Sequence, residues 1–391
     1  MTAAKPQTAP TVSLGILAWN EQDAIGATLE SIFRQSFFAE FARRGLSGEI
    51  ICVANGCTDG TAAVAAKVFE RQAQRHPWRE TFQARVVELA ERGKINAWNT
   101  FVHRLSAPAA QGLILMDGDV VLKHPDTLWN LYVTLLYHSE AAVTVDQPVK
   151  DIALKARSRA QERLSLATTA MTRTGAAQLS GQLYCLRAHL ARNIYLPKDL
   201  LVEDGFLKAV LCTDFLTRPT RPERVRQAPG ASHVFQAYVS LGDIFKNQKR
   251  QMMAQTITHL LIDRHLPGLS LEQRQHLGAT LKAKDETDPM WLRTLIADHL
   301  RRVRRFWRLF PGLATFRLER WARLPAWQRL THWPAAITGT LLTLAASWAA
   351  YRALKAGATH YWPDTKSQHL NWIPTRAAAL DGAEPLILNH E

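Results

Sequence analysis

The sequence Leu113-Ile-Leu-Met-Asp-Gly-Asp-Val-Val-Leu122 places two carboxylates directly after one apolar run and before another. An apolar run of this length is typical of a buried strand. Ligands of open α/β sheets bind outside the carboxyl ends of the strands, which is where Asp117 and Asp119 would lie. Such a pair can hold a hard divalent cation, which in turn holds a diphosphate. Because an isolated Asp-x-Asp is more often a solvated turn, its meaning depends on the surrounding chain.

The chain before this pair alternates short apolar runs with segments of helical periodicity. The runs predict strands at Val12–Ala18, Glu49–Ala54, Gln83–Leu89, Gly112–Met116 and Ala141–Asp146. The intervening segments predict helices at Ala24–Phe38, Thr61–Arg75, Ile95–Leu105 and Thr127–His138. Such alternation favours a parallel sheet with helices on both faces. The polar loops after the strands would then emerge at one edge of the sheet.

The region that follows is more mixed. A basic helix is expected at Ile152–Thr172, and Ser180–Arg187 is compatible with a strand. Two further helices are expected, at Glu203–Cys212 and at Asp243–Thr256. The first of these helices opens with two acidic residues, and the second is rich in Lys, Gln and Arg.

Composition limits the class of protein. Hydrophobic residues make up 47% of the 391 residues and charged residues 21%, which is a globular composition. A net charge of +14 indicates an acidic partner, such as an anionic membrane surface or a phosphorylated substrate. The four cysteines form no C-x-x-C pair, which favours reduced core thiols. Because the N-terminal residues contain no apolar leader, we expect the first domain to stay in the cytosol.

The C-terminal part of the chain suggests a membrane. Trp291–Arg329 carries ten arginines, and the following Leu330–Tyr351 contains no Asp, Glu, Lys or Arg. Its length and its flanking Trp and Arg residues predict a transmembrane or interfacial helix at 330–354, with a buried core helix as the alternative. Arginines upstream of this segment place the protein at the cytoplasmic face of the inner (plasma) membrane. The same arginines could bind nucleic acid, but no RNP, helix-turn-helix or zinc-finger pattern is present, so no nucleic-acid partner is expected.

Several short motifs join the acidic pair in a fixed order. They are Asn20-Glu21, Asn55-Gly-Cys-Thr-Asp-Gly-Thr61, Gly93-Lys94…Ala97-Trp-Asn99, Asp117-Gly-Asp119, Gly181-Gln-Leu-Tyr-Cys-Leu-Arg187, Glu203-Asp204-Gly-Phe-Leu207 and Asn247-Gln-Lys-Arg-Gln251. As an ordered set over roughly residues 10–260, they resemble the family 2 glycosyltransferases. The resemblance implies the GT-A fold, a Rossmann-like mixed sheet flanked by helices, here with a helical C-terminal extension.

The resemblance also implies roles on the donor side. The nucleotide-sugar would be bound by Ala18, Asn20, Glu21, Asn55, Asp59, Lys94 and Asp117. Asp119, supported by Asp117, would coordinate Mg²⁺ or Mn²⁺ that bridges the diphosphate and offsets its charge as it leaves.

The resemblance implies a catalytic group of three residues, Asp204, Glu203 and Arg250. Asp204 would be the general base for the acceptor hydroxyl, with its pKa raised by neighbouring Glu203. Arg250 would face the departing diphosphate. Two simpler interpretations stay open from the residues alone. The Glu203-Asp204 pair could merely favour a helix N-terminus, and Arg250 could belong to a solvated basic face.

Two departures from the family pattern refine the expectation. Many members have an acid where this chain has Ala54 or Asn55, which leaves the donor base open, although UDP is the expected one. The last motif ends in Gln251 where processive synthases have a Trp that helps to hold the polymer. We therefore expect transfer of a single hexosyl or N-acetylhexosaminyl group to a carbohydrate or lipid-linked acceptor, in cell-surface polysaccharide or glycolipid assembly.

The expected organisation is a flexible N-terminus (1–10), a GT-A domain (11–260), a basic Trp/Arg-rich helical region (261–329), the membrane-contacting helix (330–354) and a tail (355–391). Two alternatives to a glycosyltransferase are compatible with a sheet of this kind. A sugar-phosphate nucleotidyltransferase would need a Gly-rich basic loop after the first strand, where Trp19-Asn20-Glu21 stands instead. A catalytically silent membrane scaffold would have lost the metal acids or the base, all of which are present.

Overall fold

The computed structural model describes residues 9–154, 177–238, 240–303, 306, 309, 318–319 and 321–358. Its centre is one eight-stranded sheet in the order β3-β2-β1-β4-β7-β6-β8-β5. The strands are β1 (Val12–Ala18), β2 (Gly48–Asn55), β3 (Phe82–Leu89), β4 (Gly112–Asp117), β5 (Val121–Leu122), β6 (Val143–Lys150), β7 (Leu183–Arg187) and β8 (Val225–Phe235).

The sheet is parallel in one half and mixed in the other. Strands β3, β2, β1 and β4 are parallel neighbours, as the alternating pattern predicts. Strand β7 runs antiparallel to both β4 and β6, and β5 runs antiparallel to β8. The mixed sheet implied by the family resemblance is therefore confirmed.

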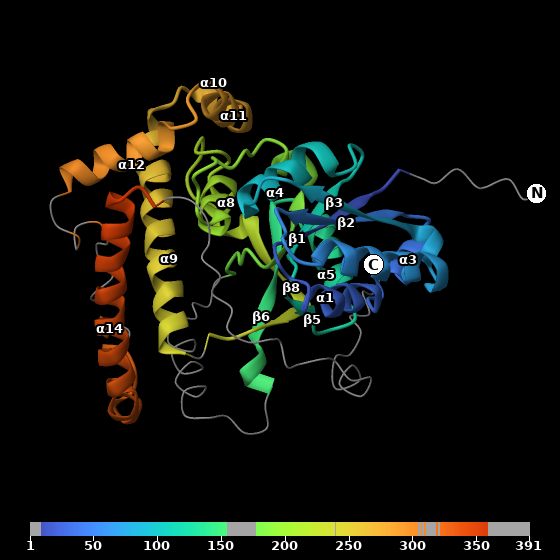
Figure 1. The fold of residues 1–391 in the computed structure, drawn as a ribbon, viewed down its shortest axis with the longest axis horizontal. Helices are drawn as coiled ribbons and strands as arrows, with labels where there is room; N and C mark the ends of the chain where they lie inside the picture. Colours follow the sequence, from blue (N-terminus) through green and yellow to red (C-terminus); the bar gives the residue numbers. More distant parts are fainter. Residues whose placement is uncertain are drawn as a thin grey trace, which may run out of the picture.

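Helices cover both faces of this sheet (Figure 1). Those up to residue 137 are α1 (Ile25–Phe33), α2 (Phe37–Arg44), α3 (Thr61–Arg75), α4 (Lys94–Thr100) and α5 (Thr127–Tyr137). Those after residue 187 are α7 (Ala188–Ala191), α8 (Glu203–Cys212), α9 (Leu241–Leu260), α10 (Leu271–Gln275), α11 (Leu277–Thr287), α12 (Trp291–Arg302) and α14 (Ala326–Lys355). Single π-helical turns extend α4 and α9, at Phe101–Leu105 and Leu261–His265. Short 3₁₀ turns lie at Arg79–Thr81, Asp151–Leu154, Pro222–Arg224 and Leu266–Gly268.

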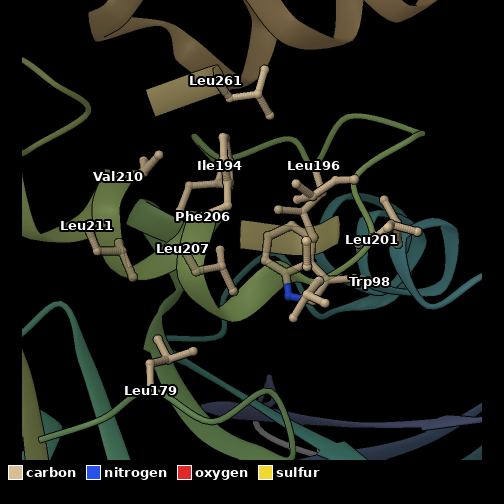
Figure 2. Packing of buried hydrophobic residues seen from close by; sticks show 14 of the residues in the cluster. Trp98, Leu179, Ile194, Leu196, Leu201, Phe206, Leu207, Val210, Leu211 and Leu261 are labelled. Carbon is tan, nitrogen blue, oxygen red and sulfur yellow. The ribbon is translucent and has the colours of Figure 1, made fainter. Parts of the chain in front are cut away.

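Side chains that alternate along the strands build two separate cores. In β4, Leu113 and Leu115 join one core while Ile114 and Met116 join the other. Alternation follows from the two-residue period of a strand. The first core packs against α4, α8, α9 and later helices, and the second packs against α1, α2, α3 and α5. Figure 2 shows part of the first core, where Phe206 and Leu207 of α8 lie with Trp98, Ile194 and Leu261 among its labelled residues.

The helix expected over Ala24–Phe38 is wrong as a single element, because the structure has α1 and α2 with a break between them. The break is held by hydrogen bonds to a loop far away in sequence. The Gln35 side-chain amide donates to the His124 carbonyl at 2.9 Å, and the Ser36 backbone N–H donates to the Pro125 carbonyl at 2.9 Å. Helical periodicity continues across the break, so a local pattern does not reveal it.

The remaining expected elements agree closely, with small shifts at their ends. Strand β7 lies within the expected Ser180–Arg187, α8 has the expected bounds, and α9 is longer than Asp243–Thr256. Most of the basic helix expected at Ile152–Thr172 lies outside the described residues. All four cysteines are free thiols, as expected.

The helices after residue 260 share the core of the sheet domain. Leu277 and Leu281 of α11, and Leu292 and Ile296 of α12, belong to the same buried cluster as Phe206 of α8. Figure 1 shows α9 lying between α14 and the rest of the fold, with α12 at one end of this pair. The expected division at residue 260 thus coincides with no gap in the core, and the domain boundaries stay a prediction.

Helix α14 covers the segment expected at 330–354, and its two faces differ. One face is buried and made mostly of small residues, namely Ala336, Thr343, Ala346, Ser347, Ala350 and Leu354. The other face carries exposed apolar side chains, namely Trp327, Leu330, Trp333, Ile337, Leu341 and Trp348. Among the helices in the described part of the chain, none is both long enough and apolar enough to cross a membrane.

Candidate active site

One large cavity, of about 830 Å³, opens at the carboxyl ends of the parallel strands. Its wall includes Trp19, Asn20 and Glu21 after β1, Asn55 at the end of β2, and the Asp117-Gly118-Asp119 segment at the end of β4. The parallel register of β2, β1 and β4 brings these residues together. Sequence motifs separated by many residues thus meet at one sheet edge, as expected for a sheet of this kind.

Lys94 is the electrostatic centre of the cavity. Its Nζ lies 2.7 Å from Asp117 Oδ1 and 2.8 Å from Glu203 Oε1, and it donates to the Gly181 carbonyl at 2.8 Å. Two carboxylates and one carbonyl oxygen thus lie around the ammonium group. Burial works to lower the pKa of Lys94, but the two carboxylates outweigh it and hold that pKa above 10.5. Lys94 therefore stays charged and joins α4, β4, α8 and the segment before β7.

This arrangement requires a glycine at position 181. A Cβ built on Gly181 would come within 2.6 Å of Glu203 Oε1. That approach is closer than any van der Waals contact, so a side chain there would push Glu203 away from Lys94. The Gly181–Arg187 motif thus contributes to the site through its backbone.

The acidic pair is crowded by negative charge. Burial is the largest cause that raises the pKa of Asp117, and Asp119 and Glu203 raise it further, against a lowering effect of Lys94. A divalent cation beside Asp117 and Asp119 would relieve this repulsion. Mg²⁺ in proteins is often held by only one or two carboxylates together with substrate phosphates. The hard oxygen donors of the pair fit this pattern, whereas the described residues contain no cluster of three or more protein ligands.

Asp204 faces the same cavity from the first turn of α8. Burial raises its pKa above 3.8, and the hydrogen bond from the Gly205 N–H, at 2.6 Å, opposes that rise. Asp117 adds to the rise, whereas Glu203, expected from the sequence to cause it, is not among the causes. Burial is thus the main cause of the raised pKa of Asp204. A carboxylate with a raised pKa, open to a cavity, is suited to accepting a proton.

Arg250 also lies in the cavity wall and not on a solvated face. Its guanidinium donates to Asn247 Oδ1 at 2.9 Å. Burial lowers the pKa of Arg250, while Tyr238, Glu203 and Asp117 work to raise it. A guanidinium so placed can bind a phosphate. By contrast, the side chain of Lys246 on the same helix is 55% exposed.

Two of the residues expected to bind the nucleotide do not line the cavity, namely Ala18 and Asp59. Asp59 instead accepts hydrogen bonds at 3.1 Å from the backbone N–H groups of Gln22 and Thr61. Burial works to raise its pKa, but the hydrogen bonds from Thr61 and Gln22 prevail and lower it. In this structure Asp59 therefore ties the start of α3 to the segment after β1.

Asn55 is buried at the same end of the cavity and links three segments. Its amide nitrogen donates to the Ala18 carbonyl at 2.7 Å, and its amide oxygen accepts from the Gly93 N–H at 3.0 Å. Asn20 pairs with Thr58, accepting from its N–H at 2.8 Å. These amides shape the loop around the cavity as well as lining it.

Several cavity residues were not expected from the sequence. Arg92 lies over the Trp19 ring, 3.3 Å from its centroid, which is a cation–π contact. Trp19 directly follows β1, so its place after a strand was a usable signal.

Two more unexpected residues line the cavity. Asp285 comes from α11, and Arg293 comes from the first turn of α12. Arg293 pairs with the buried Asp199 at 2.9 Å, and Asp285 accepts from the Lys198 N–H at 2.8 Å. No local motif marks these contacts.

One protein family and several solved structures are similar to this chain. The model of the family described as "Glycosyltransferase like family 2" matches residues 9–212, more than half of the chain. No curated protein sequence matches the chain. S. aureus TarS 1-349 in complex with UDP-GlcNAc is a similar solved structure, with 15% identity and a TM-score of 0.43 over 89% of this chain and 91% of that chain.

A second similar structure is M. tuberculosis glucosyl-3-phosphoglycerate synthase in complex with Mn2+, UDP and glucosyl-3-phosphoglycerate. Its identity is 19% and its TM-score 0.40, over 64% of this chain and 79% of that chain. The extent of the family match and the arrangement of motifs around one cavity lead to a single conclusion. This chain belongs to the glycosyltransferase-like family 2.

Proposed function

We propose that this glycosyltransferase moves one hexosyl or N-acetylhexosaminyl group from a UDP-linked donor to an acceptor hydroxyl, with inversion. One observation carries the proposal. The acidic pair Asp117 and Asp119, the Asp204 carboxyl with its raised pKa and the partly buried Arg250 line a single cavity. Without that convergence, each group would have a purely structural explanation.

The proposed donor site uses the acidic pair and the basic groups around it. Asp119 and Asp117 would hold Mg²⁺ or Mn²⁺, which supplies charge neutralisation for the diphosphate. Arg250 would bind the departing diphosphate from the α9 side. Asn20, Glu21 and Asn55 lie at the other end of the cavity, where the nucleoside would lie.

The proposed reaction is a single displacement. The acceptor oxygen forms a bond to the anomeric carbon while the bond from that carbon to the diphosphate oxygen breaks. The bonding electrons leave with the diphosphate, and the acceptor proton passes to Asp204. Attack from the face opposite the leaving group inverts the anomeric centre. A single transfer is proposed because position 251 holds a Gln and not the Trp of processive synthases.

Calorimetric titration with UDP, GDP, CDP and dTDP, with and without Mn²⁺, tests the donor site. We expect UDP to bind only when the metal is present. Asp119→Ala should weaken UDP binding by at least about a hundredfold. Mutating a residue that only hydrogen-bonds to a metal ligand typically lowers metal affinity or activity about 10–100-fold, and Asp119 would be a ligand itself. Glu70→Ala, at an exposed position on α3, is the matched control. Folded protein that binds none of the nucleotides would instead support the silent scaffold.

We further propose that the exposed face of α14 attaches the protein to the cytoplasmic face of the inner (plasma) membrane. The six exposed apolar residues of α14 recur at helical spacing and include three tryptophans, which are favoured at membrane interfaces. Arg329 and Arg352 near the two ends of this face, and the net charge of +14, would be attracted by anionic lipids of that leaflet. This location supports a lipid-linked acceptor.

Flotation with vesicles containing phosphatidylglycerol tests this attachment. Leu330 and Leu341 are 78% and 62% exposed on α14, so replacing both with Ser should not disturb the fold. We expect the double variant to bind vesicles at least about tenfold more weakly, because a buried Leu side chain contributes about 1.5–3 kcal/mol. Leu271→Ser, at a residue 54% exposed on α10, is the control. Equal binding of all three proteins would exclude α14 as the contact surface.

A further inference from the structure

The segment of residues 193–202 connects α7 with α8 and leads directly to Asp204 in the first turn of α8. We call this segment the base loop. It forms neither a helix nor a strand, yet Ile194, Leu196 and Asp199 are all at most 2% exposed. Because no regular backbone pattern fixes the base loop, its position depends on contacts with the elements around it.

One side of the base loop is held by α4. The Asn99 side chain donates to the Leu196 carbonyl at 2.8 Å and accepts from the Leu196 N–H at 3.0 Å. The same helix begins with Lys94, which pairs with Glu203 next to Asp204. This side of the loop is therefore tied to the donor side of the cavity.

The other side of the base loop is held by α10 and α11. The Asn193 side chain donates to the Gln275 carbonyl of α10 at 2.7 Å, and the Asn193 carbonyl accepts from the Gly278 N–H of α11 at 3.0 Å. Further along the loop, the Lys198 N–H donates to Asp285 of α11 at 2.8 Å. Both ends of the base loop are thus hydrogen-bonded to these helices.

An ion pair adds α12 to these contacts. Arg293 Nε lies 2.9 Å from Asp199 Oδ2, and the two side chains are 24% and 1% exposed. A carboxylate buried this deeply depends on its cation, because removal of the cation leaves an uncompensated buried charge. The pair therefore fixes the base loop a few residues before Asp204, and Arg293 lies in the same cavity wall as Asp204.

The three helices lie after the part of the chain that the family model matches, which ends at residue 212. They nevertheless belong to the core of the sheet domain, since Leu277, Leu281, Leu292 and Ile296 join its first buried cluster. A region beyond the family match therefore contacts the loop that leads to the base.

Resting on the proposed function, in which Asp204 is the base, we propose that α10, α11 and α12 position this base through the base loop. Asp199 and Arg293 are positioning residues in this proposal and transfer no proton themselves. A base must lie within hydrogen-bond reach of the acceptor oxygen, so a displaced loop slows the transfer of the sugar. The groups that hold UDP stay in place, because they come from other elements.

Two variants disturb the base loop in independent ways. Arg293→Ala removes the cation that pairs with Asp199. Gly278→Ala adds a Cβ that would come within 2.9 Å of the Asn193 carbonyl carbon and oxygen, so α11 and the loop must move apart. Gly278 is not a cavity residue, so its effect on catalysis can only pass through the loop. If Arg293→Ala does not fold, Gly278→Ala tests the same proposal.

Each variant has a matched control. Arg224→Ala breaks an ion pair with Asp214, 2.7 Å long between side chains 12% and 22% exposed, and neither residue lines the cavity. Gly268→Ala adds a Cβ that meets no atom of the described residues within 4 Å. Arg293→Lys keeps the positive charge and should restore part of what Arg293→Ala loses.

The full-length proteins are compared by hydrogen exchange of residues 193–202, by calorimetry of UDP binding, and by release of UDP from four donors with Mn²⁺. The donors are UDP-glucose, UDP-galactose, UDP-N-acetylglucosamine and UDP-N-acetylgalactosamine, with water as the acceptor. We expect faster exchange of the base loop in Arg293→Ala and Gly278→Ala, with unchanged UDP affinity. Their kcat should fall about ten- to a hundredfold, since a misplacement of about 1 Å can cost about a hundredfold in rate.

The pH profile separates positioning from a general loss of stability. Burial raises the pKa of Asp204 above 3.8. A loosened base loop exposes Asp204, so its pKa should fall toward 3.8 and the acid limb of kcat/KM should move to lower pH. Neither control should show this movement, even if Arg224→Ala lowers the melting temperature.

Distinct results would overturn the two proposals. Unchanged exchange of the base loop in both variants, an equal loss of kcat in the controls, or weakened UDP binding would each overturn the positioning of Asp204 by α10, α11 and α12. If the wild type releases UDP from none of the four donors, the proposed function itself is wrong. Hydrogen exchange would then still show whether these helices hold the loop.

Discussion

Asp204→Asn is expected to lower kcat by about a thousandfold, since general base catalysis typically contributes 10²–10⁴-fold. The affinity for UDP should not change, because the donor groups Asp119 and Arg250 are retained. Asn has the shape of Asp, and its amide oxygen can still accept the hydrogen bond from the Gly205 N–H. The measurement is a steady-state assay of sugar transfer together with calorimetry of UDP binding.

The pH dependence distinguishes a base from a helix-capping residue. Because burial raises the pKa of Asp204 above 3.8, the wild-type kcat/KM should fall as the pH decreases through that raised pKa. The residual activity of Asp204→Asn should lack this acid limb. If Asp204 only favours the start of α8, the substitution would cost about 0.3–1 kcal/mol of stability and leave kcat nearly unchanged.

Asp204→Asn should lower kcat without lowering the stability of the folded protein. A carboxyl group whose folded-state pKa is raised binds its proton more tightly in the folded than in the unfolded protein. Its ionisation therefore disfavours folding above the unfolded pKa. Asp204→Asn removes that unfavourable ionisation, so its melting temperature at pH 7 should equal or exceed that of the wild type. The Asp204 carboxylate would then be retained for catalysis although its ionisation lowers the stability of the fold.

Lys94→Met is expected to destabilise the protein by about 3–5 kcal/mol, the usual cost of removing one partner from a buried ion pair. Glu203 is 1% exposed and would lose its cation, while Asp117 would lose the same partner. Chemical denaturation measures the effect. Lys198→Met is the matched control, because its pair with Glu91 spans 3.4 Å between side chains that are 55% and 57% exposed. Exposed pairs of this kind contribute about 0–1 kcal/mol.

The loss in Lys94→Met should depend on pH in a defined direction. Lys94 lowers the pKa of Asp117, which is nevertheless raised, so removing Lys94 should raise it further. A raised carboxyl pKa favours the folded state at low pH, and that benefit is lost as the pH rises. The stability difference between the variant and the wild type should thus grow as the pH rises above the ordinary carboxyl pKa of 3.8. A pH-independent difference, or one no larger than that of Lys198→Met, would contradict the central role assigned to Lys94.

The local sequence was sufficient for much of the fold and of the donor site. The two-residue and helical periods predicted most strands and helices, because alternation along a strand and along a helix reflects which side chains are buried. The motif order then placed Asn20, Asn55 and Asp119 at one sheet edge. That inference holds because parallel strands present their carboxyl ends on the same side.

Other features depend on contacts between distant parts of the chain. The break between α1 and α2 is held by a loop about 90 residues further on. Asp59, expected to bind the nucleobase, accepts hydrogen bonds from Gln22 and Thr61, and no local pattern indicated them. The pKa of Asp204 is raised chiefly by burial, which its place in the sequence does not reveal. Burial and pairing are properties of the packed molecule, and spacing in the chain does not reveal them.

The sequence by itself determined the class of sheet, the edge that carries the chemistry and the family to which the chain belongs. Only the tertiary structure decided that Lys94 joins Asp117 to Glu203 and that α11 and α12 contribute to the wall of the cavity. The physical reason is the distance along the chain over which each property is determined. Periodicity and motif spacing encode local backbone geometry, whereas charge pairing, desolvation and cavity shape arise when distant segments pack together.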